Sequence, residues 1–208
     1  MNPPIRVKIC GITNREDALA AIDAGADALG FNLFPGSRRH TRVEELAPWL
    51  PGLGGHALRV AVMVNPSIEE ILRVRPLFDA IQLHGQETPA LCAAASATGL
   101  LWKAFPLTEG LDATRFQAHA LLIDSSVPGA FGGTGHLIDL DRAALFVRSL
   151  PGRSVWLSGG LNPANVAGAV GKVRPFGVDA ASGVEVPGDP RRKDAALVRA
   201  FVTAARVA

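Results

Sequence analysis

Cysteine is scarce in this sequence, and the cysteines present form no motif. Cys10 and Cys92 are the only two among 208 residues, and they lie far apart. Disulfide-stabilised secreted domains need more cysteines, and cysteine-based zinc sites need closely spaced pairs, so neither class fits. The sequence therefore predicts a protein of the reducing cytoplasm.

The sequence also lacks a strong excess of charge of either sign. Lys and Arg number 21 against 19 Asp and Glu, a formal net charge of +2. The densest basic clusters, Ser37–His40 and Arg191–Lys193, are short and contain no aromatic residue, so we expect solvated surface there. Nucleic-acid-binding proteins need a basic stripe or patch, and this composition therefore predicts no nucleic-acid partner.

Long apolar runs are missing as well. No apolar stretch approaches the ~18 residues that a membrane-spanning helix needs. Met1–Pro4 leads directly into a strand-like run, without the charged and apolar regions of a signal peptide. We therefore expect no membrane partner.

The chain does contain a regular alternation of strand-like and helix-like segments. Its length and its 48% apolar content suffice for one domain over residues 1–208. The strand-like segments are apolar throughout, which is typical of parallel strands covered on both faces. They are Ile5–Cys10, Ala26–Phe34, Leu58–Asn65, Phe78–His84, Leu100–Phe105, Ala120–Asp124, Ser154–Ser158 and Phe176–Ala181. The helix-like segments are Arg15–Ala24, Val43–Leu50, Ser67–Arg75, Thr88–Thr98, Asp139–Leu150, Pro163–Gly171 and Asp194–Val207, with a short helix expected at Thr114–His119.

Eight such βα units fit either a closed (β/α)8 barrel or an open doubly wound α/β sheet. An open sheet concentrates its unusual residues near one switch point. Here polar and Gly-rich sequence follows the first, second, sixth, seventh and eighth strands. We therefore predict a single-domain (β/α)8 TIM barrel, whose chemistry lies at the carboxyl ends of the strands.

The segment Lys8–Arg15 is the most informative in the chain. An apolar strand ends on Cys10, Gly11 turns the chain, and Thr13 or Asn14 can cap the following helix. A thiol at this place lies where such barrels keep their catalytic residues. Free cysteine is also a common buried core residue, and the residues alone leave that alternative open.

Three late loops are candidates for holding a phosphate. Asp124 ends the sixth strand and a Gly-rich loop follows it, while small residues also follow the seventh and eighth strands. Phosphate sites of these barrels are built there, because small residues let the backbone approach the anion closely. A turn-capping Asp and a merely flexible loop would look the same. Gly132, Gly133 and Gly135 allow backbone N–H groups to converge on an anion, and the turns after the seventh and eighth strands contain Ser158, Gly159, Gly160, Ser182 and Gly183.

Polar residues near two other strands complete the candidate site. Arg39 follows the second strand and can bind a carboxylate through its guanidinium, although an exposed loop arginine is the simpler interpretation. Gln82 and His84 end the fourth strand and face the same mouth. They are either ligand contacts or satisfied residues of the wall.

In this order, the motifs resemble those of the phosphoribosylanthranilate isomerase family. The resemblance runs from Val7 to about Asp194. It implies a barrel that catalyses the Amadori rearrangement of N-(5'-phosphoribosyl)anthranilate in tryptophan biosynthesis, without a metal or organic cofactor. The motifs that carry it are Lys8–Thr13, Gly25–Phe31, Ser37–Arg39, Gln82–Gly85, Asp124, Gly132–Gly135, Leu157–Pro163 and Ser182–Glu185.

The resemblance also implies roles for single residues. Cys10 is the general base, Asp124 the general acid and Arg39 the contact to the anthranilate carboxylate. The three Gly-rich loops bind the substrate phosphate, through Gly133, Gly135, Gly159, Gly160, Ser182 and Gly183. Two residues depart from the family pattern: Ala181 replaces a usual serine, and His40 replaces a frequent aromatic. An insertion at Gly188–Arg192 is a third departure. All three bear on affinity more than on the acid–base pair.

Two alternatives compete with this function. Another phosphosugar-isomerase barrel, histidine-pathway-like or bifunctional, would share the phosphate loops, but such enzymes carry an aspartate where Cys10 stands. A non-catalytic phosphometabolite-binding barrel would need neither acid nor base, and both are present. The expected partner is a phosphorylated small molecule, and the expected assembly a monomer or homodimer.

Overall fold

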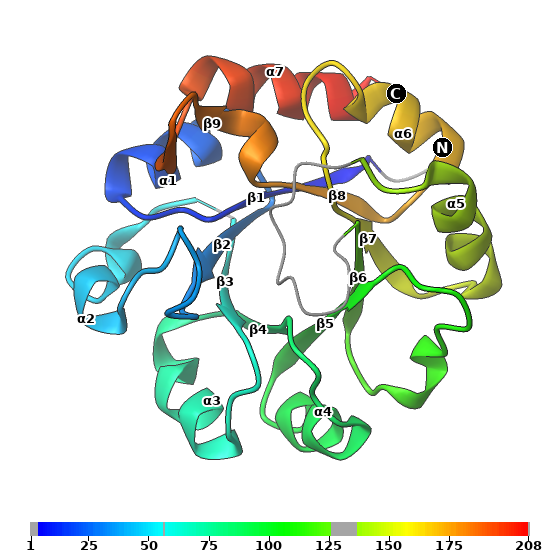
Figure 1. Ribbon diagram of the computed structural model, residues 1–208. Helices are drawn as coiled ribbons and strands as arrows, with labels where there is room; N and C mark the ends of the chain where they lie inside the picture. The colour runs from blue at the N-terminus through cyan, green and yellow to red at the C-terminus, as the bar shows by residue number, and fades with distance from the viewer. Residues whose placement is uncertain (1–3, 56, 126–136, 208) are drawn as a thin grey trace.

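Eight parallel strands close into a barrel in the computed structural model, which describes residues 4–55, 57–125 and 137–207 (Figure 1). Each strand pairs with its neighbour in sequence, and β1 closes the ring by pairing with β8, with Lys8 opposite Asp179. The closed barrel is therefore confirmed, and the open-sheet alternative is wrong. The barrel strands are β1 (Arg6–Cys10), β2 (Ala28–Asn32), β3 (Leu58–Met63), β4 (Ala80–Leu83), β5 (Leu100–Pro106), β6 (Ala120–Asp124), β7 (Ser154–Leu157) and β8 (Gly177–Ala180).

Helices surround the barrel on its outside (Figure 1). They are α1 (Arg15–Asp23), α2 (Val43–Leu46), α3 (Ile68–Val74), α4 (Pro89–Ser96), α5 (Leu140–Ser149), α6 (Val166–Val173) and α7 (Ala195–Arg206), with 3-10 turns η1 (Leu50–Gly52) and η2 (Arg75–Leu77). Their starts follow local chemistry. At α3, the Glu70 N–H donates to the Ser67 hydroxyl and the Ser67 N–H donates to the Glu70 carboxylate, which forms a capping box. None of the helices in the described ranges is long and apolar enough to cross a membrane.

The connection between β5 and β6 differs from the prediction. A helix was expected at Thr114–His119, whereas the structure forms only the 3-10 turn η3 (Ala113–Arg115). Phe116 is extended and packs against Phe105, with ring centroids 4.9 Å apart. His119 accepts a hydrogen bond from the Leu101 N–H. These two contacts connect the segment before β6 to β5.

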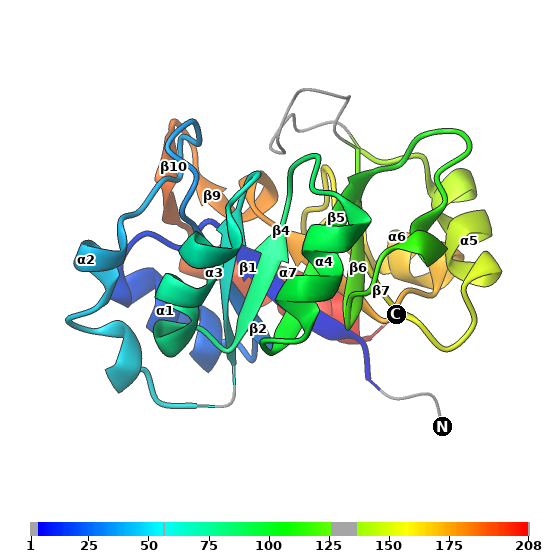
Figure 2. The same cartoon turned by 90° about the horizontal axis from the view of Figure 1, so that it is seen from below.

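A small hairpin follows β8 and was not predicted. After the 3-10 turn η4 (Ser182–Val184), strands β9 (Glu185–Val186) and β10 (Asp189–Lys193) pair in antiparallel fashion. Figure 2 places the hairpin at the end of the barrel opposite to the N-terminus, which is the carboxyl end of the strands. The insertion at Gly188–Arg192 is therefore part of the rim around the barrel mouth.

Alternating residues of the strands β2 to β7 belong to two separate apolar clusters, whereas β1 and β8 contribute apolar residues to the larger one. The larger includes Val7, Ile9 and Ile123 and lies between the strands and the helices. The smaller fills the barrel interior and includes Trp102 and Trp156, whose ring centroids are 4.6 Å apart. A cavity of about 550 Å³ opens at the amino end of the barrel, where the first residues of the strands line it. It lies at the opposite end from Cys10 and Asp124 and is therefore not the candidate site.

Candidate active site

Cys10 lies at the carboxyl end of β1, and the absence of a side chain on β2 makes room for it. Its register partner is Gly30. A Cβ atom on Gly30 would lie 2.7 Å from the Cys10 Sγ and 3.0 Å from the Lys8 Nζ, closer than packed atoms approach. Cys10 is partly exposed and belongs to neither apolar cluster. The thiol is therefore a residue of the barrel mouth and not of the core.

A buried ion pair lies directly beneath this thiol. Lys8 is fully buried, and its Nζ is 2.8 Å from the Asp179 Oδ1. Burial pushes the pKa of Lys8 down, but the charges of Asp179 and Cys10 outweigh it and hold that pKa above its ordinary value. The Ser158 hydroxyl donates to the Asp179 Oδ2 over 3.2 Å. Ser158, expected to contact substrate, thus holds Asp179 in this structure.

The same groups set the charge state of Cys10. Burial raises the pKa of the Cys10 thiol, and the Asp179 carboxylate raises it further. Lys8 and Lys193 lower it, and the balance leaves the pKa above the usual cysteine range. The fraction of thiolate at neutral pH therefore depends on how closely the cations approach the sulfur.

Asp124 ends β6 and is nearly fully buried, next to Gln82 of β4 and to His84, which follows β4. The His84 Nε2 is 3.6 Å from the Asp124 Oδ2, and the Gln82 Nε2 is 3.2 Å from the His84 Nδ1. Within the described residues, the Gln82 Oε1 and the His84 Nε2 are buried without a hydrogen-bond partner. Buried polar atoms are normally satisfied, so these two are available to a ligand. In the same part of the chain, no group of three or more His, Cys, Asp and Glu residues is placed to hold a metal ion.

Arg39 is buried, contrary to the prediction of an exposed basic cluster. Its side chain lies across Gly11, whose φ of 78° and lack of a Cβ leave the space, so it passes beside the turn that follows Cys10. The Arg39 Nε is 2.5 Å from the Glu185 Oε1, and its Nη2 is 3.1 Å from the Glu185 Oε2. This pair takes one edge of the guanidinium. In the described part of the chain, Nη1 has no partner, so the other edge is free to bind a carboxylate.

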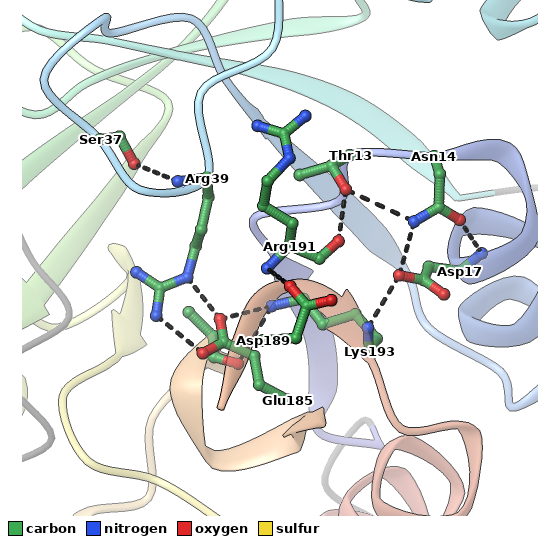
Figure 3. A network of polar contacts seen from close by, with 10 residues as sticks. Thr13, Asn14, Asp17, Ser37, Arg39, Glu185, Asp189, Arg191 and Lys193 are labelled. Carbon is green, nitrogen blue, oxygen red and sulfur yellow. Dashed lines mark hydrogen bonds and ion pairs between the residues drawn. The ribbon is translucent and has the colours of Figure 1, made fainter. Parts of the chain in front are cut away.

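Glu185 is the functional candidate that sequence reasoning missed. Figure 3 shows Arg39 and Lys193 converging on its carboxylate. The Lys193 Nζ donates to the Glu185 Oε1 and to the Ala181 carbonyl, each over 3.1 Å, and Lys193 is buried although its cluster was expected at the surface. Burial raises the pKa of Glu185, but the two cations outweigh it and hold the pKa below its ordinary value. Glu185 belongs to a family motif, but no sequence signal pairs it with an arginine 146 positions away.

The loops after β6, β7 and β8 touch one another through their glycines. A Cβ atom on Gly159, where φ is 95°, would lie 2.5 Å from the Ser125 backbone nitrogen. Gly183 lies against the Leu161 carbonyl, where a Cβ would collide with the backbone. Gly160 also has a positive φ of 67°, and Ser182 begins the turn η4. The predicted phosphate ligands Gly133 and Gly135 lie outside the described residues.

Comparison with known proteins places this geometry in one family. The profile of the family described as N-(5'phosphoribosyl)anthranilate (PRA) isomerase matches residues 7–204. The N-(5'-phosphoribosyl)anthranilate isomerase of Geobacter sulfurreducens is 42% identical, and the match covers 97% of this chain and 98% of that one. A crystal structure of monomers generated from the dimeric enzyme of Thermotoga maritima matches with a TM-score of 0.82 and 35% identity, covering 98% of this chain and 100% of that one. A family structure in complex with reduced 1-(o-carboxyphenylamino)-1-deoxyribulose 5-phosphate matches with a TM-score of 0.83, 35% identity and the same coverage.

Proposed function

Because this chain belongs to the N-(5'-phosphoribosyl)anthranilate isomerase family, we propose that Cys10 and Asp124 perform the family's reaction as its base and acid. The enzyme converts N-(5'-phosphoribosyl)anthranilate into 1-(2-carboxyphenylamino)-1-deoxyribulose 5-phosphate, a step of tryptophan biosynthesis. One observation carries the assignment of roles. A thiol at the end of β1 and a buried carboxyl group at the end of β6 lie at the same mouth of a closed barrel.

The first step opens the furanose ring. Asp124, protonated, donates to the ring oxygen as the bond from that oxygen to C1' breaks. The anthranilate nitrogen supplies its electron pair to C1', and a Schiff base forms that is conjugated with the aromatic ring. A positioned general acid contributes roughly 10²–10⁴-fold to such a step.

The second step moves a proton from carbon to the thiolate. Cys10 removes the proton from C2', the electron pair of that bond forms the C1'–C2' double bond, and the electrons of the Schiff base return to nitrogen. The resulting enolamine tautomerises to the ketone product. In that tautomerisation the hydroxyl on C2' loses a proton and C1' gains one. Cys10 ends as a neutral thiol and Asp124 as a carboxylate, so the thiol must lose a proton and the carboxylate must regain one before the next turnover.

Arg39 and the loops after β7 and β8 provide places for the two charged ends of the substrate, its carboxylate and its phosphate. We infer that the free edge of the Arg39 guanidinium binds the anthranilate carboxylate, since the Glu185 pair already fixes its plane. The phosphate then lies at the contacting loops after β7 and β8, with the start of η4 among them. This geometry is typical of phosphate sites in such barrels.

A turnover assay tests the function against its alternatives. The fluorescence of N-(5'-phosphoribosyl)anthranilate reports its consumption directly. The enzyme should consume it and leave the aminoaldose substrate of the histidine pathway unchanged. Turnover of both substrates would support a bifunctional barrel, and turnover of neither would support a binding protein.

One structural relative is described as a dimeric enzyme from which monomers were generated. We propose that this chain is likewise a monomer or a homodimer acting on a phosphorylated small molecule in the cytoplasm. Size-exclusion chromatography with light scattering would decide the assembly.

A further inference from the structure

We propose that Lys8 is a positioning residue for catalysis: its buried ammonium is the counter-ion of the Cys10 thiolate, and Asp179 limits that effect by sharing the ammonium. The proposal rests on the proposed role of Cys10 as the base. Lys8 itself neither donates nor accepts a proton in the proposed mechanism.

The strand geometry places the two side chains together. Lys8 and Cys10 are two positions apart on β1, so both project from the same face of the strand, into the barrel. Gly30 on β2 is opposite Cys10, and one added Cβ there would crowd both the Cys10 Sγ and the Lys8 Nζ. The ammonium and the thiol therefore share one small space.

The burial of Lys8 gives this contact its strength. Lys8 is 0% exposed, and a buried ammonium is tolerated only beside anions. Asp179 supplies one anion at 2.8 Å and is itself held by Ser158. A thiolate on Cys10 would be the second. When Cys10 is a neutral thiol, the Lys8–Asp179 pair is balanced, and when it ionises the same ammonium serves two anions.

The other charged groups around the sulfur are already committed to partners. Lys193 and Arg39 face Cys10 from β10 and from the loop after β2, and both are paired with Glu185. Asp179 faces it from β8 as the opposing anion. Lys8 thus supports the thiolate and Asp179 opposes it. Neutralising one should move the acidity of Cys10 in the direction opposite to neutralising the other.

The experiment measures the rate of Cys10 alkylation by iodoacetamide against pH, with mass spectrometry of the modified peptide. Lys8→Met should slow alkylation at pH 8 by about tenfold, because one unit of pKa changes the thiolate fraction tenfold below the pKa. Asp179→Asn should accelerate it. Cys92 is fully buried and burial raises its pKa to about 11, so it should not react and serves as a control thiol within the same protein.

A second comparison covers the case in which Lys8→Met leaves Asp179 unpaired and unfolds the protein. The double variant Lys8→Met/Asp179→Asn buries no unpaired charge and differs from Asp179→Asn only at Lys8. In Asp179→Asn, the Cys10 thiolate becomes the anion that balances the Lys8 ammonium, which is why its alkylation should be fast. Its Cys10 should react about tenfold more slowly than that of Asp179→Asn. Equal alkylation rates in the double variant and in Asp179→Asn would overturn the proposal. So would alkylation rates that change in the same direction in Lys8→Met and in Asp179→Asn.

The pH profile of turnover separates this proposal from the role of Cys10. In the wild type, the apparent pKa that governs the rise of kcat/KM with pH should lie above the usual cysteine range. In each variant, this pKa should shift together with the pKa that governs alkylation. If the pKa of alkylation shifts as expected while the pKa of the kcat/KM profile does not, Lys8 lowers the pKa of a thiol that is not the base. If neither pKa changes in the variants, Lys8 has only a structural role.

Discussion

At the scale of single residues, the space around the Cys10 thiol exists because Gly30 has no side chain. Gly30 faces Cys10 and Lys8 across the β1–β2 pair, and its hydrogen is all that fits there. Gly11 similarly leaves the path along which Arg39 reaches the mouth. These two glycines leave the space that the side chains of Cys10, Lys8 and Arg39 occupy.

Gly30→Ala tests this dependence. The new methyl group would lie 2.7 Å from the Cys10 Sγ, so the thiol must move. Displacing a reacting group by about 1 Å costs on the order of 10²-fold in rate, and we expect a kcat loss of that size in a folded protein. Gly52→Ala is the matched control, since a Cβ there meets nothing within 4 Å. A wild-type kcat in Gly30→Ala would show that Cys10 is not held at the reacting carbon.

Single residues could be predicted from the sequence where a strand end marks them. Cys10 and Asp124 both close apolar strands, and the structure places both at the mouth. The burial of Arg39 could not be predicted in this way. It depends on Glu185, and that pairing exists only once β1, β2 and β8 lie side by side.

At the scale of elements, the hairpin β9–β10 and the loop after β2 support each other. Besides the Arg39–Glu185 pair, the Arg191 Nη1 donates to the His40 carbonyl over 2.6 Å, and the Thr13 hydroxyl donates to the Arg191 carbonyl. The hairpin escaped prediction because its strands are short and polar, with no apolar run to indicate them. The barrel strands and most helices were predicted well, because apolar runs and capping residues mark them.

Arg39→Lys measures what this arrangement contributes to binding. An ammonium cannot hold Glu185 through one edge and a carboxylate through the other, so the substitution should raise KM at least about tenfold, the loss of one charge-assisted hydrogen bond. The carboxylate barely changes charge during the reaction, so kcat should fall less. Arg38→Lys, at an exposed position of the same loop, is the control. Unchanged KM in Arg39→Lys would place the carboxylate elsewhere.

The contact between the loops after β7 and β8 predicts an anion site. Inorganic phosphate should compete with substrate, and Gly183→Ala should weaken both the competition and substrate binding. The added Cβ collides with the Leu161 carbonyl and must separate the two loops. Gly168→Ala in α6 meets nothing within 4 Å and should leave inhibition by phosphate unchanged. Equal inhibition of Gly183→Ala and wild type would exclude these loops as the anion site.

At the scale of the whole molecule, closure of the barrel creates the site. The pairing of β1 with β8 brings Asp179 to Lys8, 171 positions away in sequence, and the ring brings the ends of β4 and β6 together at His84 and Asp124. The count of βα units could predict a closed ring. It could not predict which polar side chains would meet inside, because those contacts depend on strand register and side-chain packing.

The most direct test of the account is the turnover of Cys10→Ala beside Cys92→Ala, both checked by circular dichroism. Cys92 is buried in α4, in the apolar cluster between the strands and the helices, so its variant should keep wild-type kcat. Cys10→Ala should keep the fold and lose at least about 10²-fold in kcat, because the C2' proton loses its acceptor. A folded Cys10→Ala enzyme with wild-type kcat would contradict the central claim that this thiol is the base.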